Sequence, residues 1–127
     1  MPLVRISLRQ GKTAGYRDKI GDGVHRAMVE AINVPAQDRF QVITEHPSDG
    51  LIYDPSYLGI RRTDDVVFIQ ITLNAGRTVD QKRALYRKVT ELLAKEPGVR
   101  PEDVVISLVE VAKENWSFGN GLAPYAT

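Results

Sequence analysis

The sequence contains no cysteine, which excludes disulfide bonds, thiol nucleophiles and thiolate metal ligands. It has only two histidines, His25 and His46, which lie far apart in different predicted elements, so we predict no metal site. No apolar run approaches the roughly 18 residues that a transmembrane helix needs. The sequence therefore gives little evidence for a metal centre and contains no apolar run long enough to span a bilayer.

An excess of charge of one sign is also missing. The 17 basic and 16 acidic residues leave a net charge of +1, which favours neither nucleic acid nor an anionic membrane as a partner. The first ten residues, MPLVRISLRQ, lack the basic and long apolar regions of a secretory signal peptide. We therefore expect a cytoplasmic protein with no nucleic-acid partner and no membrane partner.

The chain does contain an internal sequence repeat with an offset of 65 residues, which we call the echo. Its 127 residues, 43% of them hydrophobic, suit a single domain over residues 1–127. Adding 65 to a residue number maps several positions of the first half onto the same or a similar residue in the second. Pro2 then corresponds to Val67, inside a strongly apolar strand, so we expect Pro2 at the start of an ordered strand. Other matching pairs are Gly11 with Gly76, Lys12 with Arg77, Thr13 with Thr78, and Asp38 with Asp103.

Each half has the same predicted order of strand, turn, helix, loop and strand. Alternating apolar residues predict four strands. These strands cover residues 3–8, 39–45, 66–73 and 103–111. The pseudo-repeats therefore span about 1–45 and 66–111, with a connecting loop at 46–65 and an ordered C-terminal loop at 112–127. At 20 residues the connecting loop is long, so we expect a small hairpin or a functional loop there.

The helices have their own signals. An apolar stripe at helical spacing over residues 20–32 predicts the first helix. Thr78 and Gln81 form a capping-box pattern at the start of the second helix, and the dipeptide Pro97-Gly98 ends it.

These elements favour an α+β fold in which two βαβ repeats form one four-stranded mixed sheet with both helices on one face. The other face still carries apolar residues, among which we count Leu3, Phe68 and Leu108. Such a face must be covered, and a symmetric oligomer is the simplest cover.

One topological assumption gathers several reactive groups at one rim. If an approximate two-fold axis relates the halves, the start of the first strand, with Pro2, lies beside the turn that carries Arg77. The start of the second strand brings Asp38 to the same rim, and the end of the fourth strand brings Trp116 and Phe118. The sequence thus predicts an amine, a carboxylate, a guanidinium and two aromatic rings in one place.

Those groups suit proton transfer on a small carboxylate. If Met1 is removed, Pro2 has a secondary amine, whose pKa burial and the nearby Arg77 would both lower toward neutrality. Arg77 directly precedes a helix N-terminus and can bind a carboxylate through two parallel hydrogen bonds. Asp38 could polarise a water molecule or hold the prolyl ammonium charged, and Trp116 and Phe118 could exclude solvent. Each residue also has a purely structural interpretation. Asp38, for example, matches Asp103 in the echo, and both could simply be residues at the start of a strand.

Four segments make the chain resemble the tautomerase superfamily, and within it the malonate semialdehyde decarboxylase-like group. They are the Pro2-Leu3 start, VPAQDRFQ at residues 34–41, AGRTVDQK at 75–82 and NWSFGNG at 115–121. The resemblance implies a homotrimer without a cofactor, in which Pro2 is the catalytic base or acid. It further implies that Asp38 works with the proline and water, that Arg77 binds the substrate carboxylate, and that Trp116 and Phe118 form a hydrophobic wall.

The exact reaction stays open between alternatives. Some decarboxylases of this group carry a second arginine two residues before the position of Arg77, where this chain has Ala75. We therefore predict keto-enol tautomerisation of a small 2-oxo or enol carboxylate, with decarboxylation of a 3-oxo acid as the alternative. A second alternative is a non-catalytic ferredoxin-like binding module whose ligand contacts the loop at 46–65.

Overall fold

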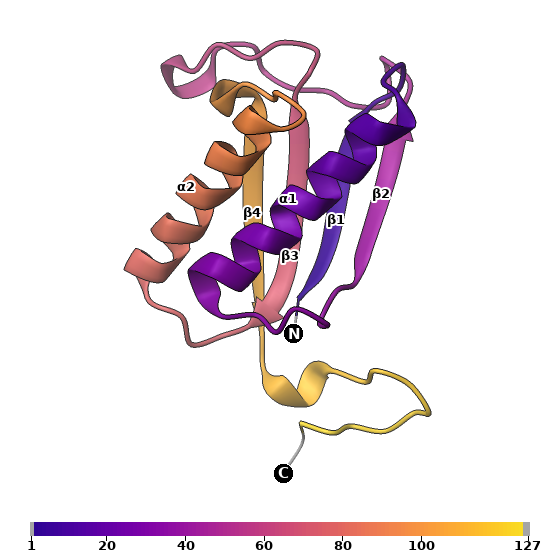
Figure 1. Ribbon diagram of the computed structural model, residues 1–127, viewed down its shortest axis with the longest axis vertical. Coiled ribbons are helices and arrows are strands. Elements are labelled where there is room, and N and C mark those ends of the chain that lie inside the picture. Colours follow the sequence, from indigo (N-terminus) through magenta and orange to yellow (C-terminus); the bar gives the residue numbers. More distant parts are fainter. Residues whose placement is uncertain (1, 126–127) are drawn as a thin grey trace.

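The computed structural model describes residues 2–125, which form a four-stranded sheet with two helices across one face (Figure 1). Met1, whose removal we predict, and residues 126–127, at the end of the predicted C-terminal loop, lie outside the described residues. The strands are β1 Leu3–Arg9, β2 Gln41–His46, β3 Val67–Asn74 and β4 Val104–Val111. The helices are α1 Ala14–Ile32 and α2 Val79–Lys95. Three short 3-10 turns span Tyr57–Gly59, Pro101–Asp103 and Lys113–Asn115.

The two halves of the chain meet at the middle of the sheet, whose strand order is β2-β1-β3-β4. β1 is parallel to β2, β3 is parallel to β4, and the central pair β1 and β3 is antiparallel. The predicted α+β class, with two βαβ repeats in one mixed sheet, is therefore confirmed. In this topology β1 and β2 start at the same edge of the sheet at which β3 and β4 end. We call this side of the sheet, where strand ends rather than an edge strand are found, the Pro2 edge; it lies at the bottom of the sheet in Figure 1.

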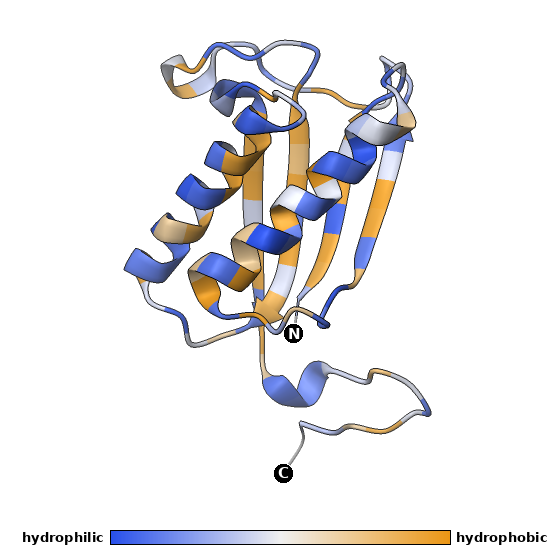
Figure 2. Cartoon of the chain, in the orientation of Figure 1, coloured by the Kyte–Doolittle hydropathy of each residue, from blue (hydrophilic) through white to orange (hydrophobic). Residues whose placement is uncertain are grey.

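Alternate residues of the two central strands form the core. Side chains of successive strand residues point to opposite faces, so one set of each strand meets the helices. That buried set is Val4, Ile6, Leu8, Val67, Ile69, Ile71 and Leu73. Figure 2 shows these strands as largely hydrophobic, whereas each helix is divided between hydrophobic and hydrophilic residues. Only the helix-covered face of the sheet is therefore sealed from water within the part of the chain described here.

Local signals set the helix ends, as predicted. The backbone N–H of Gln81 donates to Thr78 Oγ1 at 3.2 Å, and the backbone N–H of Thr78 donates to Gln81 Oε1 at 2.8 Å, so the capping box is present. The buried stripe of α2 is Leu85, Val89, Leu92 and Leu93. A Cβ atom on Gly23 would lie 2.8 Å from Leu93 Cδ2, so a glycine at this position lets α1 approach α2 closely.

Two sequence predictions are corrected by the sheet. β2 begins at Gln41 rather than at residue 39, because the preceding residues form turns in which the N–H of Asp38 donates to the carbonyl of Pro35 at 3.0 Å. Leu108 does not lie on the open face: it pairs with Ile71 of β3, which faces the helices, and packs against the core. Leu3 and Phe68 do lie on the open face, because their strand neighbours Val4 and Val67 belong to the core.

The connection between β2 and β3 is an ordered loop. Residues 47–66 are all described and contain no strand, so this segment does not form the hairpin that we gave as one alternative. Arg62 Nη1 donates to the carbonyls of Asp54 and Tyr57 at 3.2 and 3.1 Å, which holds the loop against itself. Within residues 2–125, neither helix combines the length and apolar character needed to cross a membrane.

Candidate active site

Pro2 lies buried at the Pro2 edge, immediately before β1. The backbone N–H of Val4 donates to the carbonyl of Phe40 at 3.0 Å, which joins the start of β1 to the residue before β2. Leu3 pairs with Thr72 of β3, so continuing the antiparallel register by one residue places Pro2 opposite Leu73. Proline is tolerated in this position because a first strand residue need not donate a ladder hydrogen bond.

A cavity of about 200 Å³ opens beside Pro2. We call it the Pro2 pocket, and its lining is mainly apolar. It is lined by Pro2, Leu3, Phe40, Trp116, Ser117 and Phe118. The structure therefore brings together three of the five residues that the sequence nominated, namely Pro2, Trp116 and Phe118. Asp38 and Arg77, the other two, are not among the residues that line it.

Four aromatic rings, which we call the aromatic wall, contact one another at the pocket, and three of them line it. Trp116 stacks on Phe118 with ring centroids 5.4 Å apart and an interplanar angle of 13°. Phe40 lies 6.2 Å from Phe118, and Tyr125 meets Phe118 edge-on at 5.4 Å. Sequence reasoning missed Phe40 and Tyr125. Phe40 could have been found, since it comes two residues after Asp38 in the segment that enters β2.

Arg77 lies in the turn between β3 and α2, one residue before the N-cap Thr78. Its Nη1 donates to the carbonyl oxygen of Asn74 at 3.2 Å. The neighbouring carboxylate, Glu110, is bound instead by Lys82 Nζ at 2.7 Å, and Lys82, the N–H of Gly76 and Arg77 together lower the pKa of Glu110. The guanidinium of Arg77 thus lies just before the N-terminus of α2, a position where backbone N–H groups and the helix dipole favour an anion.

Asn74 is a further residue that the sequence did not single out. Its side-chain Oδ1 accepts a hydrogen bond from Trp116 Nε1 at 2.7 Å, across 42 residues of chain. Its main-chain oxygen accepts the hydrogen bond from Arg77. The hydrogen bond from Arg77 is local, three residues along the chain, but no local pattern signals the one from Trp116, because it joins the segments that follow β3 and β4.

Asp38, itself half-buried, lies in the largely exposed segment that leads from α1 into β2. Burial raises the pKa of the Asp38 carboxyl above its ordinary value, while neighbouring positive charges, His25 among them, act in the opposite direction. His25 Nε2 lies 2.8 Å from the carbonyl oxygen of Ala36, which ties this segment to α1. A carboxyl with a raised pKa is a candidate for proton transfer.

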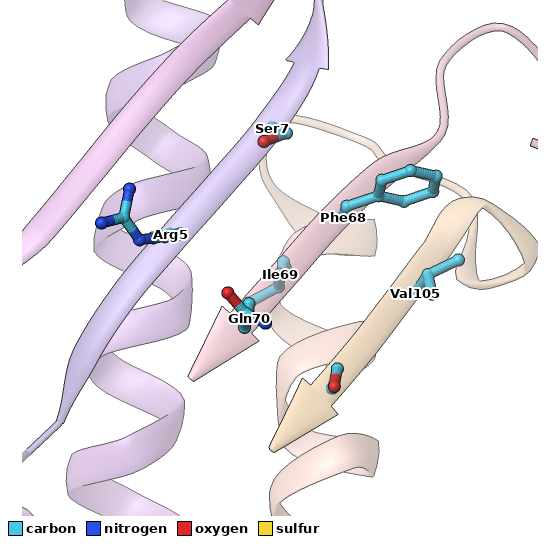
Figure 3. Close-up of a pocket in the computed structure, with 7 residues that line it drawn as sticks. Arg5, Ser7, Phe68, Ile69, Gln70 and Val105 are labelled. Atoms are coloured by element: carbon cyan, nitrogen blue, oxygen red, sulfur yellow. The ribbon is translucent and has the colours of Figure 1, made fainter. Parts of the chain in front are cut away.

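A larger hollow of about 380 Å³ lies elsewhere, on the open face of the sheet, and we call it the sheet-face hollow (Figure 3). Its residues come from β1, β3 and β4. They are Arg5, Ser7, Phe68, Ile69, Gln70, Val105 and Ser107. It contains no acid or base besides the arginine, and Pro2 does not line it, so its greater volume does not make it the better candidate for chemistry. Among residues 2–125, no three His, Asp or Glu side chains are grouped in a way that could hold a metal ion.

Two protein-family models match the sequence. Both are described as "Tautomerase enzyme", and one matches over residues 38–119 and the other over residues 2–61. The first spans more than half of the chain and runs from the Asp38 position through the Trp116–Phe118 segment. The second begins at Pro2.

Two curated relatives are similar over nearly their whole length. The chain is 46% identical over 123 residues to the probable tautomerase YusQ of Bacillus subtilis (strain 168), covering 97% of each protein. It is 37% identical over 127 residues to the probable tautomerase YrdN of the same organism, covering all of this chain and 98% of the relative.

Solved structures of similar fold include two malonate semialdehyde decarboxylases. FG41 malonate semialdehyde decarboxylase inhibited by 3-bromopropiolate superposes with a TM-score of 0.92 at 41% identity, covering 97% of this chain and 93% of that one. A second malonate semialdehyde decarboxylase, solved in wild-type, mutant and inactivated forms, gives 0.91 at 33% identity, covering 97% and 95%. A fused 4-OT described as a symmetric trimer shares the fold, with a TM-score of 0.78 at 22% identity over 94% of each chain.

Proposed function

Since the chain belongs to the tautomerase family, we propose that it is an enzyme that moves a proton between keto and enol forms of a small 2-oxo or enol carboxylate. The reacting group in this proposal is the secondary amine of Pro2, freed by removal of Met1, and no cofactor takes part. The observation that carries the proposal is the position of Pro2, buried at the head of β1 and lining an apolar pocket beside the aromatic wall.

Proton transfer follows from that position. A buried amine with the Arg77 cation nearby holds its proton less tightly than an exposed one, so the neutral base is available near neutral pH. The amine accepts a proton from the substrate in one step and returns a proton to the substrate in the next. The net reaction therefore moves one hydrogen and consumes nothing.

Arg77 and Asp38 complete the proposed site. The guanidinium of Arg77, beside the N-terminus of α2, binds the substrate carboxylate and orients it toward Pro2. Asp38, with its raised pKa, exchanges a proton with the amine or with water between turnovers. The aromatic wall keeps bulk water from the reacting carbon.

The ketonisation of phenylenolpyruvate, followed by its ultraviolet absorbance, tests the proposal. We expect processed wild-type protein to accelerate the reaction and Pro2→Ala to lose at least about 100-fold of that rate, as expected when a positioned base is disturbed. Pro55→Ala, at an exposed proline of the connecting loop, is the matched control and should retain the rate. Equal rates for wild type and Pro2→Ala would contradict the proposal.

A second candidate reaction is the decarboxylation of a 3-oxo acid. It is favoured by the likeness to the two malonate semialdehyde decarboxylases, at 41% and 33% identity. Release of carbon dioxide from malonate semialdehyde, with no ketonisation of phenylenolpyruvate, would make this the main activity. Ligand binding that survives Pro2→Ala, with no turnover of either substrate, would instead support the binding-module alternative.

We also propose that the protein assembles as a homotrimer through the open face of the sheet. Three valines on the edge strands β2 and β4 are exposed on this face: Val42 by 43%, Val105 by 37% and Val109 by 37%. The sheet-face hollow, which Val105 helps to line, lies on the same face. Fused 4-OT structures of the same fold are described as trimers. Light scattering should give three chains for wild type and for Ala94→Asp, on the outer surface of α2, but fewer for Val109→Asp. The proposed reaction needs no nucleic-acid or membrane partner. We propose that the protein acts in the cytoplasm.

A further inference from the structure

We infer that Asn74 is a positioning residue that holds the aromatic wall and the Arg77 guanidinium in one fixed geometry. Asn74 is the last residue of β3 and pairs with Val111, the last residue of β4. The next peptide is fixed as well, because the N–H of Ala75 donates to the carbonyl of Val111 at 2.9 Å. Asn74 therefore sits at a rigid point of the sheet, from which two separate parts of the site are held.

The first part is the aromatic wall. Trp116 follows β4 and the 3-10 turn Lys113–Asn115, so nothing in the sheet ladder holds its ring. The indole N–H can only donate, and Asn74 Oδ1, 2.7 Å away, is the acceptor that it meets. Because Trp116 stacks on Phe118, fixing the indole also fixes the second ring. Without this acceptor the indole N–H would have to turn toward water.

The second part is Arg77. Its hydrogen bond goes to the main-chain oxygen of the same Asn74, at 3.2 Å. The distance between the cationic end of the site and its aromatic end is therefore set by one residue. Alternation along β3 places Asn74 on the same sheet face as Thr72, whose partner Leu3 lines the Pro2 pocket.

This arrangement bears on substrate choice. In the proposed reaction a substrate carries its carboxylate at Arg77 and its remaining groups against the wall, so the fixed spacing selects substrates by length and shape. The inference rests on the proposed function for its kinetic consequence but not for its structural one. Loss of the Asn74 side chain should weaken binding of a bulky carboxylate more than it slows the chemical step, because Pro2 is not touched.

The single tryptophan of the chain makes the test direct, since all tryptophan emission comes from Trp116. Asn74→Ala should shift the emission to longer wavelength and raise KM for phenylenolpyruvate about tenfold, with kcat changed less than threefold. Asn74→Asp keeps an oxygen acceptor and should retain the wild-type emission. Thr72→Val, on the same face of β3, is the control and should change neither quantity.

A double-mutant cycle separates positioning from general disturbance. Trp116→Phe keeps an aromatic ring but removes the N–H, so adding Asn74→Ala to it should raise KM no further. The inference is overturned if Asn74→Ala leaves the emission unchanged, or if the two substitutions raise KM independently. Emission needs no turnover, so an inactive wild type would remove the proposed function while the spectra of Asn74→Ala and Asn74→Asp still decide the role of Asn74. Melting curves for each variant show whether it is folded.

Discussion

The two ends of the sheet occupy equivalent places in the repeat but differ in the contacts that their equivalent residues make. The 65-residue echo relates Asp38 at the Pro2 edge to Asp103 at the other edge. Asp103 is completely buried, and its carboxylate accepts hydrogen bonds from the N–H and the hydroxyl of Thr63, both at 2.7 Å. Asp38 is only half-buried, and burial raises its pKa. One carboxylate is thus fixed by the connecting loop, whereas the other is the one that the proposed function gives a role in proton transfer.

Lys12 and Arg77, the basic residues that the echo pairs, also differ in their contacts. Lys12 is bound by a carboxylate, with its Nζ 2.7 Å from Asp65. Arg77 donates a hydrogen bond to the carbonyl of Asn74 instead, and the neighbouring carboxylate Glu110 is bound by Lys82. At the edge of the sheet that holds Asp103, the connecting loop forms hydrogen bonds to the carboxylate. At the Pro2 edge, the segment after β4 lines a pocket instead. The same βαβ framework therefore yields a closed, structural end and an open end suited to a ligand.

Among the substitutions that compare the two ends, the largest effect should come from replacing Arg77 with alanine, set against the same change at Lys12. Arg77→Ala removes the charged hydrogen bonds to the substrate and should lower kcat/KM about 50-fold, since a hydrogen bond to a charged group contributes about 1.5–3 kcal/mol. Lys12→Ala, at the equivalent position, should leave kcat/KM within about twofold of wild type. Steady-state kinetics on phenylenolpyruvate measures both, and a similar loss in the two variants would erase the proposed difference between the ends.

The next effect concerns the buried carboxylate. Asp103→Asn replaces an acceptor that binds both the N–H and the hydroxyl of Thr63, and should lower the free energy of unfolding by about 2 kcal/mol. Asp38→Asn should not destabilise the protein, because its charged form is disfavoured by burial. Urea denaturation of the two isosteric variants gives the comparison. Equal destabilisation would mean that Asp38 is as structural as its counterpart.

A smaller loss is expected from the partner of Asp103. Thr63→Val removes one hydroxyl, which donates to Asp103 and accepts from the N–H of Asp65 at 3.2 Å, but keeps the backbone N–H. The free energy of unfolding should fall by about 1 kcal/mol while kcat/KM is unchanged. Thr44→Val, at an exposed position of β2, serves as the control in the same denaturation experiment. A loss of activity in Thr63→Val would connect the closed end to catalysis, contrary to the account.

The smallest effect is a pH dependence of stability from Asp38. Its pKa is raised in the folded protein, so on raising the pH the unfolded chain loses this proton first. Below the unfolded value of about 3.9 the group is neutral in both states and has no effect. As the pH rises from there through the folded pKa, wild type should lose stability relative to Asp38→Asn. Melting temperatures at pH 3.5 and 7 should show the variant gaining by about 1–3 °C at the higher pH only. A gain confined to the lower pH would reverse the sign and contradict a raised pKa.

Local chemistry accounts for what the sequence predicted well. The capping box at Thr78 and Gln81 needs only four consecutive residues, and the apolar stripe of α2 needs only helical spacing, so both could be found without tertiary information. The meeting of Pro2 with Trp116 and Phe118 followed from the antiparallel relation of the halves, which the echo made a natural assumption.

The misses are tertiary in origin. β4 is apolar on both faces, so alternation could not show that Leu108 points toward the helices; its pairing with Ile71 decides that. The link from Asn74 to Trp116 joins residues 42 apart in the chain through one side-chain hydrogen bond. Such a contact has no local signature, because it depends on how β3 and β4 end side by side.

The central claim is that the amine of Pro2 does the chemistry, and one preparation can test it. The protein is made with an N-terminal fusion joined directly to Pro2, and phenylenolpyruvate ketonisation is measured before and after a protease releases the fusion. The account predicts that the rate rises at least about 100-fold on release, because the nitrogen changes from an amide to a basic amine. Trp116 emission, recorded in the same samples, checks that the pocket is intact in both. A fusion that turns over as fast as the released protein would contradict the claim.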